Sequence, residues 1–122
     1  AAPAVISVVC LMRMNRIDAS ELLLTGERVS AERVVRAGLV TRCVDEGALD
    51  ATVQSYADAF RLCGPRALAN TKKLIRRVPY MGIDEAFEWT TALSAELFGS
   101  PEAREGMSAF LGKRLPSWAP QE

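Results

Sequence analysis

The groups that could carry chemistry in this 122-residue chain are chiefly carboxylates and cations, because the sequence contains no histidine. A Ser-His-Asp triad, a Cys-His pair and a histidine metal site are therefore excluded within the chain. The three cysteines, Cys10, Cys43 and Cys63, lie far apart in apolar surroundings and lack metal-ligand spacing. We expect them to be buried, reduced thiols of a cytoplasmic protein, with no metal bound.

Cations gather at two places, and these are the candidates for anion binding. Such clusters are usually solvated helix faces, with a specific anion site as the alternative. The members are Lys72, Lys73, Arg76 and Arg77, and then Lys113 and Arg114. Over the whole chain 15 basic and 15 acidic residues cancel, so no net field draws the protein to nucleic acid or to an anionic membrane.

The apolar run at residues 1–12 bears on membranes and on chain length. It is shorter than the roughly 20 residues that span a bilayer, and it lacks the basic leader of a signal peptide. We therefore expect no membrane as a partner. An apolar start without an initial methionine leads us to expect further chain upstream.

Helical signals dominate the elements that would position these groups. Residues 4–14 fit a short helix or a strand, since periodicity does not decide for so short a run. After them, Asp18 is predicted to cap a helix, with Ile17 and Leu22 forming a hydrophobic staple across the cap. Gly26 supplies a left-handed stop to that helix.

The next segment contains the one predicted strand. Ser30 is placed to cap a helix over residues 31–37, which Gly38 ends. Residues 39–44, LVTRCV, alternate and are rich in β-branched side chains, which predicts a short strand. Because one strand cannot form a sheet, it needs strands from another part of the molecule, or the prediction is wrong.

Four helices are predicted beyond it. The first, at about residues 49–63, should bury a stripe, and Gly64-Pro65 starts a second that runs to about Arg77. Asp84 can cap a third, at residues 85–98, and Ser100-Pro101 begins a fourth that reaches about Leu111. We expect residues 116–122 to be loosely held. The predicted stripe consists of Leu49, Val53, Tyr56, Phe60 and Cys63.

Three stretches of this mostly helical chain resemble a known family. Residues 24–40 read LTGERVSAERVVRAGLV, and residues 64–72 read GPRALANTK. Residues 96–114 read ELFGSPEAREGMSAFLGKR, and Pro116-Ser117-Trp118 follows. In this order and spacing they resemble the part of enoyl-CoA hydratases and isomerases, the crotonase family, that follows the active-site half.

The resemblance implies a fold and a division of the chain. We expect a mostly α structure with one short strand, the C-terminal helical part of the family's α/β spiral fold, with the N-terminal ββα core absent from this chain. Residues 1–48 would be the end of that core, with short helices and a strand. Residues 49–122 would form the helical region that mediates trimerisation and covers CoA.

The resemblance also implies chemistry on acyl-CoA thioesters, such as hydration of 2-enoyl-CoA in fatty-acid oxidation. Two backbone N–H groups would hold the thioester oxygen, and a pair of glutamates would perform acid–base catalysis. By alignment, the two glutamates and the segments with the two N–H groups fall before Ala1, so we assign no catalytic residue in this chain. Glu21, Glu27 and Glu32 match helix caps and surface positions. Relatives carry a glycine-rich stretch where this chain has residues 1–7, AAPAVIS, which leaves the exact reaction open.

Three residues are expected to contact the substrate. Phe98 and Phe110 match family positions that line the acyl and adenine region, and Lys113 matches a lysine that approaches the CoA phosphates. Phe110 and Lys113 share a face if the last helix continues through them. The alternative is that both aromatic rings belong to the core and that Lys113 is solvated.

The remaining expectations concern cofactors and partners. The resemblance implies no separate cofactor, because coenzyme A is part of the substrate. It implies a homo-oligomer, a trimer or a dimer of trimers, and contact with the N-terminal half of the same subunit. Two alternatives stay open: a non-catalytic helical module that only oligomerises, and an unrelated helical binding domain.

Overall fold

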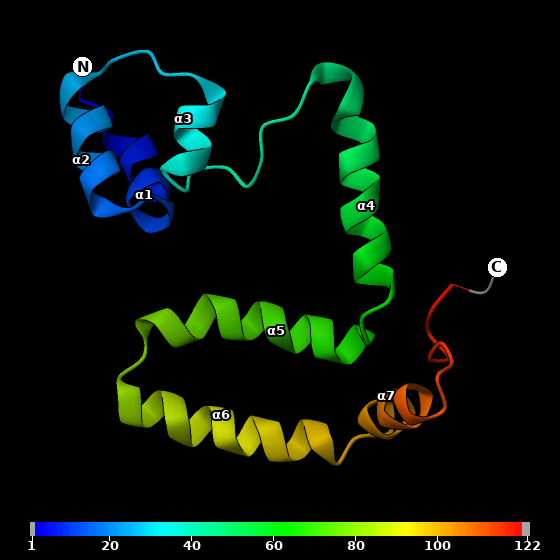
Figure 1. Cartoon of the computed structure of the whole chain (residues 1–122). Coiled ribbons are helices and arrows are strands. Elements are labelled where there is room, and N and C mark those ends of the chain that lie inside the picture. The colour runs from blue at the N-terminus through cyan, green and yellow to red at the C-terminus, as the bar shows by residue number, and fades with distance from the viewer. Residues whose placement is uncertain (1, 121–122) are drawn as a thin grey trace. The chain divides into compact units, whose positions relative to one another are not determined.

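The computed structural model describes residues 2–120, and all regular structure in this range is helical (Figure 1). The chain divides into two compact units, residues 1–49 and residues 50–122.

The first unit begins with three helices, α1 (Ala4–Arg13), α2 (Arg16–Thr25) and α3 (Ala31–Arg36), and ends with a 3-10 turn, η1 (Glu46–Ala48). The apolar run at the start is therefore a helix. Gly26 ends α2 in the left-handed region with φ 64°, as predicted. Ser30 caps α3 by accepting a hydrogen bond from the Arg33 N–H at 3.3 Å, also as predicted.

The cap of α2 differs from the prediction by one turn. Asn15, not Asp18, is the capping residue, and its side chain accepts a hydrogen bond from the Asp18 N–H at 2.9 Å. The hydrophobic staple shifts with it, because the residue before the cap is Met14 and the fourth helical residue is Ala19. Both are buried, whereas Ile17 is 83% exposed, so the Ile17–Leu22 staple is wrong.

The end of α3 forms a Schellman motif. Gly38 has φ 88° and donates to the Val35 carbonyl at 3.0 Å, while Leu39 donates to Val34 at 3.0 Å. A β-carbon on Gly38 would lie 3.0 Å from the Arg13 carbonyl oxygen. Glycine is therefore required here both by its backbone angle and by the close approach of α1.

The strand predicted at residues 39–44 is wrong. These residues form bends and irregular backbone, and the described part of the chain offers no other strand for them to pair with. A strand needs a hydrogen-bonded neighbour, so alternation alone does not create one. The thiol of one residue in this segment, Cys43, lies 3.8 Å from a carboxylate oxygen of Glu32.

The second unit contains α4 (Leu49–Arg61), α5 (Pro65–Arg77), η2 (Val78–Tyr80), α6 (Ile83–Phe98) and α7 (Pro101–Leu111). Helix α4 is amphipathic, but none of its residues is buried. The prediction that α4 buries an apolar stripe is wrong. Of the stripe's residues, Tyr56 is half-buried and the others are exposed, namely Leu49, Val53, Phe60 and Cys63. The pattern defines a face, and no described segment packs over that face closely enough to bury it.

Helices α5 and α6 run antiparallel and are joined at both ends. Near the start of α5, Arg66 forms an ion pair with Glu96, which lies near the end of α6. At the other end, the Arg77 guanidinium lies 4.4 Å from the centre of the Trp89 ring. Helix α6 begins at Ile83 with Gly82 as the capping residue, so the prediction that Asp84 caps it is wrong.

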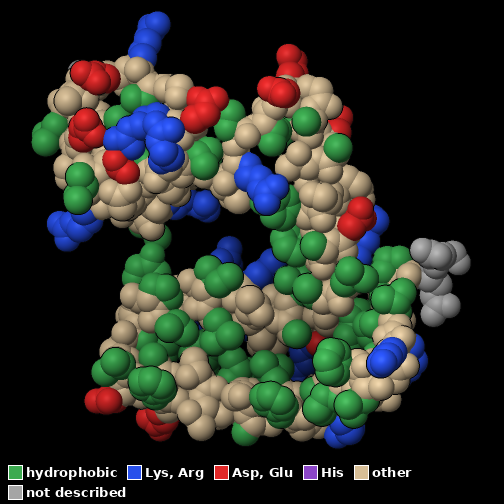
Figure 2. Space-filling view, viewed as in Figure 1, with side chains coloured by type: hydrophobic (Ala, Val, Ile, Leu, Met, Phe, Trp, Pro, Cys, Tyr) green, Lys and Arg blue, Asp and Glu red, His purple; other side chains and the backbone are tan. Residues whose placement is uncertain are grey.

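Hydrophobic side chains gather on the surface over α5 and α6 in Figure 2. Buried residues are few and mostly small in the described range, and no large side chain there is fully buried. Cys10 is buried, but Cys43 and Cys63 are exposed, which corrects the expectation of three buried thiols. Among the described residues, no helix is long and apolar enough to cross a membrane.

Candidate functional site

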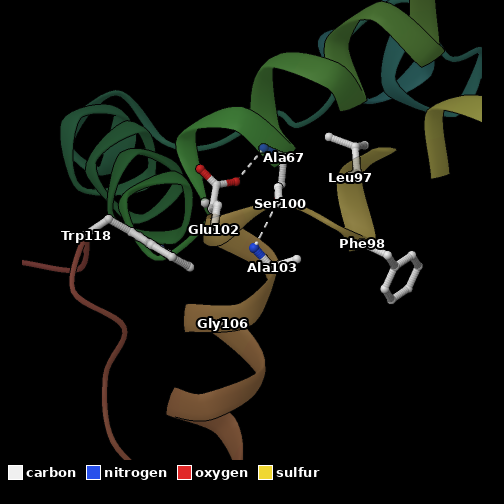
Figure 3. Close-up of a pocket in the computed structure, with 9 residues that line it drawn as sticks. Ala67, Leu97, Phe98, Ser100, Glu102, Ala103, Gly106 and Trp118 are labelled. Carbon is white, nitrogen blue, oxygen red and sulfur yellow. Dashed lines mark hydrogen bonds between the residues drawn. The ribbon is translucent and has the colours of Figure 1, made fainter. Parts of the chain in front are cut away.

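An apolar pocket of about 270 Å³ lies in the second unit, where α5 begins and α6 gives way to α7 (Figure 3). The sequence places a turn here because Gly99 ends α6 and Ser100 caps α7. The buried Ser100 hydroxyl accepts a hydrogen bond from the Ala103 N–H at 3.1 Å. The lining residues are Gly64, Ala67, Leu97, Phe98, Ser100, Glu102, Ala103, Gly106 and Trp118.

The charged group in this lining is Glu102, and its carboxylate caps α5 from outside that helix. One oxygen accepts a hydrogen bond from the Arg66 N–H at 2.9 Å, and the other accepts from the Ala67 N–H at 2.8 Å. These donors have no partner inside α5, and Gly64 supplies no side-chain cap. Figure 3 shows the carboxylate turned toward Ala67. Glu102 therefore fixes the start of α5 to α7.

One wall of the pocket is the Trp118 indole. Its ring N–H donates to the Leu62 carbonyl at 3.2 Å, and the ring lies over Gly106, where an added β-carbon would be 3.4 Å away. The next residue, Ala119, is buried. The prediction of a loosely held tail is therefore wrong for residues 116–119, while residues 121 and 122 lie outside the described range.

Of the three residues expected to contact the substrate, Phe98 lines this pocket. It is the last residue of α6, it is 68% exposed, and it lies on the opposite side of the pocket from Trp118 (Figure 3). It also borders a groove between α5 and α6 that includes Leu74 and Leu93. Within the described residues Phe98 is not enclosed by other side chains.

Phe110 and Lys113 lie further along, outside the lining of this pocket. Phe110 is 83% exposed on α7. Helix α7 ends at Leu111, and Lys113 follows with φ 50°, in the left-handed region. The helix therefore does not continue through both residues. A hydrogen bond from the Lys113 N–H to the Phe110 carbonyl at 3.2 Å links them instead.

An ion pair next to Lys113 was not predicted from the sequence. Arg114 donates to both carboxylate oxygens of Glu105, at 2.7 and 2.9 Å. Glu105 also accepts the Ser117 N–H at 2.8 Å. Hydrogen bonding to Arg114, and then to Ser117, lowers the pKa of Glu105 from 4.5 to about 2. Opposite charges nine residues apart carry no periodic signal, so only the turn after α7 reveals the pair.

The other carboxylates with altered pKa values lie at helix starts in the first unit. The pKa of Asp18 is lowered, first by hydrogen bonding to Arg33 and then to Asn15. That of Glu32 is lowered, first by hydrogen bonding to Ser30. Glu21 pairs with Arg33 at 2.8 Å. In the described residues, no three His, Cys, Asp or Glu side chains are grouped so that they could hold a metal ion.

Comparison with known proteins decides the family. The model of the Enoyl-CoA hydratase/isomerase family matches residues 2–121. The chain belongs to this family. Enoyl-CoA hydratase EchA19 of Mycobacterium tuberculosis is 34% identical over 100 residues, which are 82% of this chain and 38% of that protein. Carnitinyl-CoA dehydratase of Citrobacter koseri is 31% identical over 103 residues, 81% of this chain and 40% of the relative.

Solved structures of the family share the fold. An enoyl-CoA hydratase/isomerase from Marinobacter aquaeolei matches with a TM-score of 0.86 and 31% identity, over 97% of this chain and 45% of that one. An enoyl-CoA hydratase from Mycobacterium smegmatis matches with a TM-score of 0.84 and 35% identity, over 92% of this chain and 44% of that one. The chain thus spans less than half the length of these relatives. Its fold is the helical C-terminal part of the crotonase fold, without the expected strand.

Proposed function

We propose that this chain is part of an enzyme that acts on acyl-CoA thioesters, with hydration of a 2-enoyl-CoA as its reaction. The observation that carries the proposal is the family match over residues 2–121, together with relatives named as an enoyl-CoA hydratase and a carnitinyl-CoA dehydratase. The free thiols of all three cysteines support a cytoplasmic location. No separate cofactor is proposed, since coenzyme A enters as part of the substrate.

The role proposed for this segment is to contribute part of the CoA site. Phe98 would contact the apolar part of the substrate, because its exposed ring borders an apolar pocket. Phe110 would stack on adenine and Lys113 would approach the phosphates. In support, the Phe110 ring is exposed, and the Lys113 side chain is exposed and forms no ion pair within residues 2–120.

A second proposed role is subunit contact. Large apolar side chains lie exposed along α6 and α7, and exposed apolar surface of this kind marks interaction sites. We propose that they contact the N-terminal half of the same subunit and neighbouring subunits in a trimer or a dimer of trimers. The side chains concerned are Ile83, Phe87, Met107 and Leu111.

The test is CoA-ester binding by the full-length protein that contains this chain. Lys113→Ala should weaken binding about tenfold at low salt, the loss expected for one charge-assisted contact. Arg28→Ala is the control, since this exposed cation lies outside both clusters of cations and forms no ion pair in the described range. Unchanged binding in Lys113→Ala would remove the residue from the site. Hydration of crotonyl-CoA by residues 1–122 alone would refute the alternative of a non-catalytic module.

A further inference from the structure

Lys113 adopts a backbone conformation that its side chain disfavours. Among the described non-glycine residues it is the one with positive φ, at 50°. Gly112, directly before it, has φ −79°, which any residue adopts. The left-handed position after a helix is usually glycine, because a β-carbon is crowded there. The chain therefore places a lysine where glycine would fit better, and strain of this kind concentrates at functional sites.

Two backbone hydrogen bonds define the turn that contains this lysine. The Lys113 N–H donates to Phe110, and the Arg114 N–H donates to Ala109 at 3.0 Å. Together they form a Schellman motif at the end of α7. The motif is ordinarily stable with glycine, so with lysine it needs further support.

The support comes from Arg114 and Glu105. The bidentate pair, at 2.7 and 2.9 Å, fixes the guanidinium in one plane against α7. Arg114 also donates to the Leu115 carbonyl at 3.1 Å, and Glu105 accepts the Ser117 N–H. These contacts fix the backbone that follows Lys113, at Leu115 through Arg114 and at Ser117 through Glu105. They therefore restrain the peptide group between Lys113 and Arg114.

We propose that Glu105 and Arg114 are positioning residues, which hold Lys113 in its left-handed conformation and so direct its ammonium group toward the phosphates of the CoA ester. This inference rests on the proposed function of Lys113. It adds that the affinity contributed by the lysine depends on a carboxylate that never touches the substrate. Without the pair, residue 113 relaxes to a less strained conformation and its Cα–Cβ bond points elsewhere.

The test is a double-mutant cycle between Glu105 and Lys113 in the full-length protein. Binding of butyryl-CoA is measured by titration calorimetry at low salt for the wild type, Glu105→Gln, Lys113→Ala and the double variant. We expect Lys113→Ala to weaken binding about tenfold and Glu105→Gln to weaken it several-fold. The double variant should bind no more weakly than Lys113→Ala, because Glu105 acts through the lysine.

Controls separate positioning from general stability. Glu85→Gln alters an exposed glutamate of α6 that forms no ion pair in the described range, and it should bind like the wild type. Arg114→Lys keeps the charge but loses the bidentate geometry, and it should reproduce Glu105→Gln. If Glu105→Gln fails to give a native circular dichroism spectrum, Arg114→Lys takes its place in the cycle.

Each outcome has a distinct meaning. If Lys113→Ala weakens binding and Glu105→Gln does not, the positioning role is refuted and the proposed CoA contact survives. If Lys113→Ala has no effect, the CoA contact fails, and the inference that depends on it fails too. If Glu105→Gln weakens binding equally with and without Lys113, Glu105 has a general structural role and the inference is overturned.

Discussion

The carboxylate of Glu102 should be worth about 2 kcal/mol to the stability of the second unit. It accepts two hydrogen bonds from the first N–H groups of α5, and Gly64 offers no side-chain cap of its own. Loss of a capping side chain costs about 0.5–2 kcal/mol. We place Glu102→Ala at the upper end of that range, because two donors lose their partner and a negative charge leaves the positive end of the helix.

Gly64 supplies an independent way to remove the same contact. A β-carbon built on Gly64 would collide with the Glu102 carboxylate, so Gly64→Ala must push the carboxylate away from α5. The backbone angles of Gly64, φ −58° and ψ 130°, suit alanine. Gly64→Ala should therefore destabilise the wild type by about 1–2 kcal/mol but have little effect in Glu102→Ala.

The assay is urea unfolding of the wild type, both single variants and the double variant, followed by circular dichroism at 222 nm. The expected free energies of unfolding are similar for Glu102→Ala and the double variant. Glu88→Ala serves as the control, since this exposed glutamate of α6 has no hydrogen-bond partner in the described range. Additive effects of the two substitutions, or a change below about 0.3 kcal/mol for Glu102→Ala, would refute the capping role.

Three further predictions concern α7 and the turn that follows it. Lys113→Gly should raise the free energy of unfolding by about 1 kcal/mol, whereas Lys113→Ala should not, because only glycine relieves the left-handed strain. Since the pKa of Glu105 falls from 4.5 to about 2 on folding, its stabilisation is complete above pH 4.5 and disappears as the pH falls toward 2. The stability difference between the wild type and Glu105→Gln, measured by urea unfolding across this range, should shrink accordingly, and a constant difference would contradict it. Gly106→Ala should stabilise by up to about 1 kcal/mol in thermal unfolding, because its methyl group would meet Trp118 at an ordinary 3.4 Å.

Helix ends could be predicted from the sequence where one residue type has a single strong role. Ser30, Gly26 and Ser100 act as the local rules require. The start of α2 was missed by one turn because Asn15 and Asp18 are both good caps. What selects Asn15 is the burial of Met14 against the first unit's core, which is a tertiary contact.

The substrate contacts expected from the sequence stay predictions. The family resemblance led to Phe98, which lines the pocket, and to Phe110 and Lys113, whose contact with CoA stays a prediction. Glu102 and Glu105 could not be found as partners from the sequence. Glu102 acts on donors 35 and 36 residues away, and Glu105 acts across a turn whose shape depends on a lysine in a glycine position.

The predicted strand and the predicted buried stripe are wrong for one physical reason. The alternating residues 39–44 and the apolar stripe of α4 each form a face that could be buried. Whether such a face is buried depends on the segment that packs against it. In the described residues no strand pairs with the first, and the second remains exposed. The chain spans 45% of the Marinobacter aquaeolei structure that it matches with a TM-score of 0.86. We propose these two faces as further surfaces for subunit contact, beside the exposed side chains of α6 and α7.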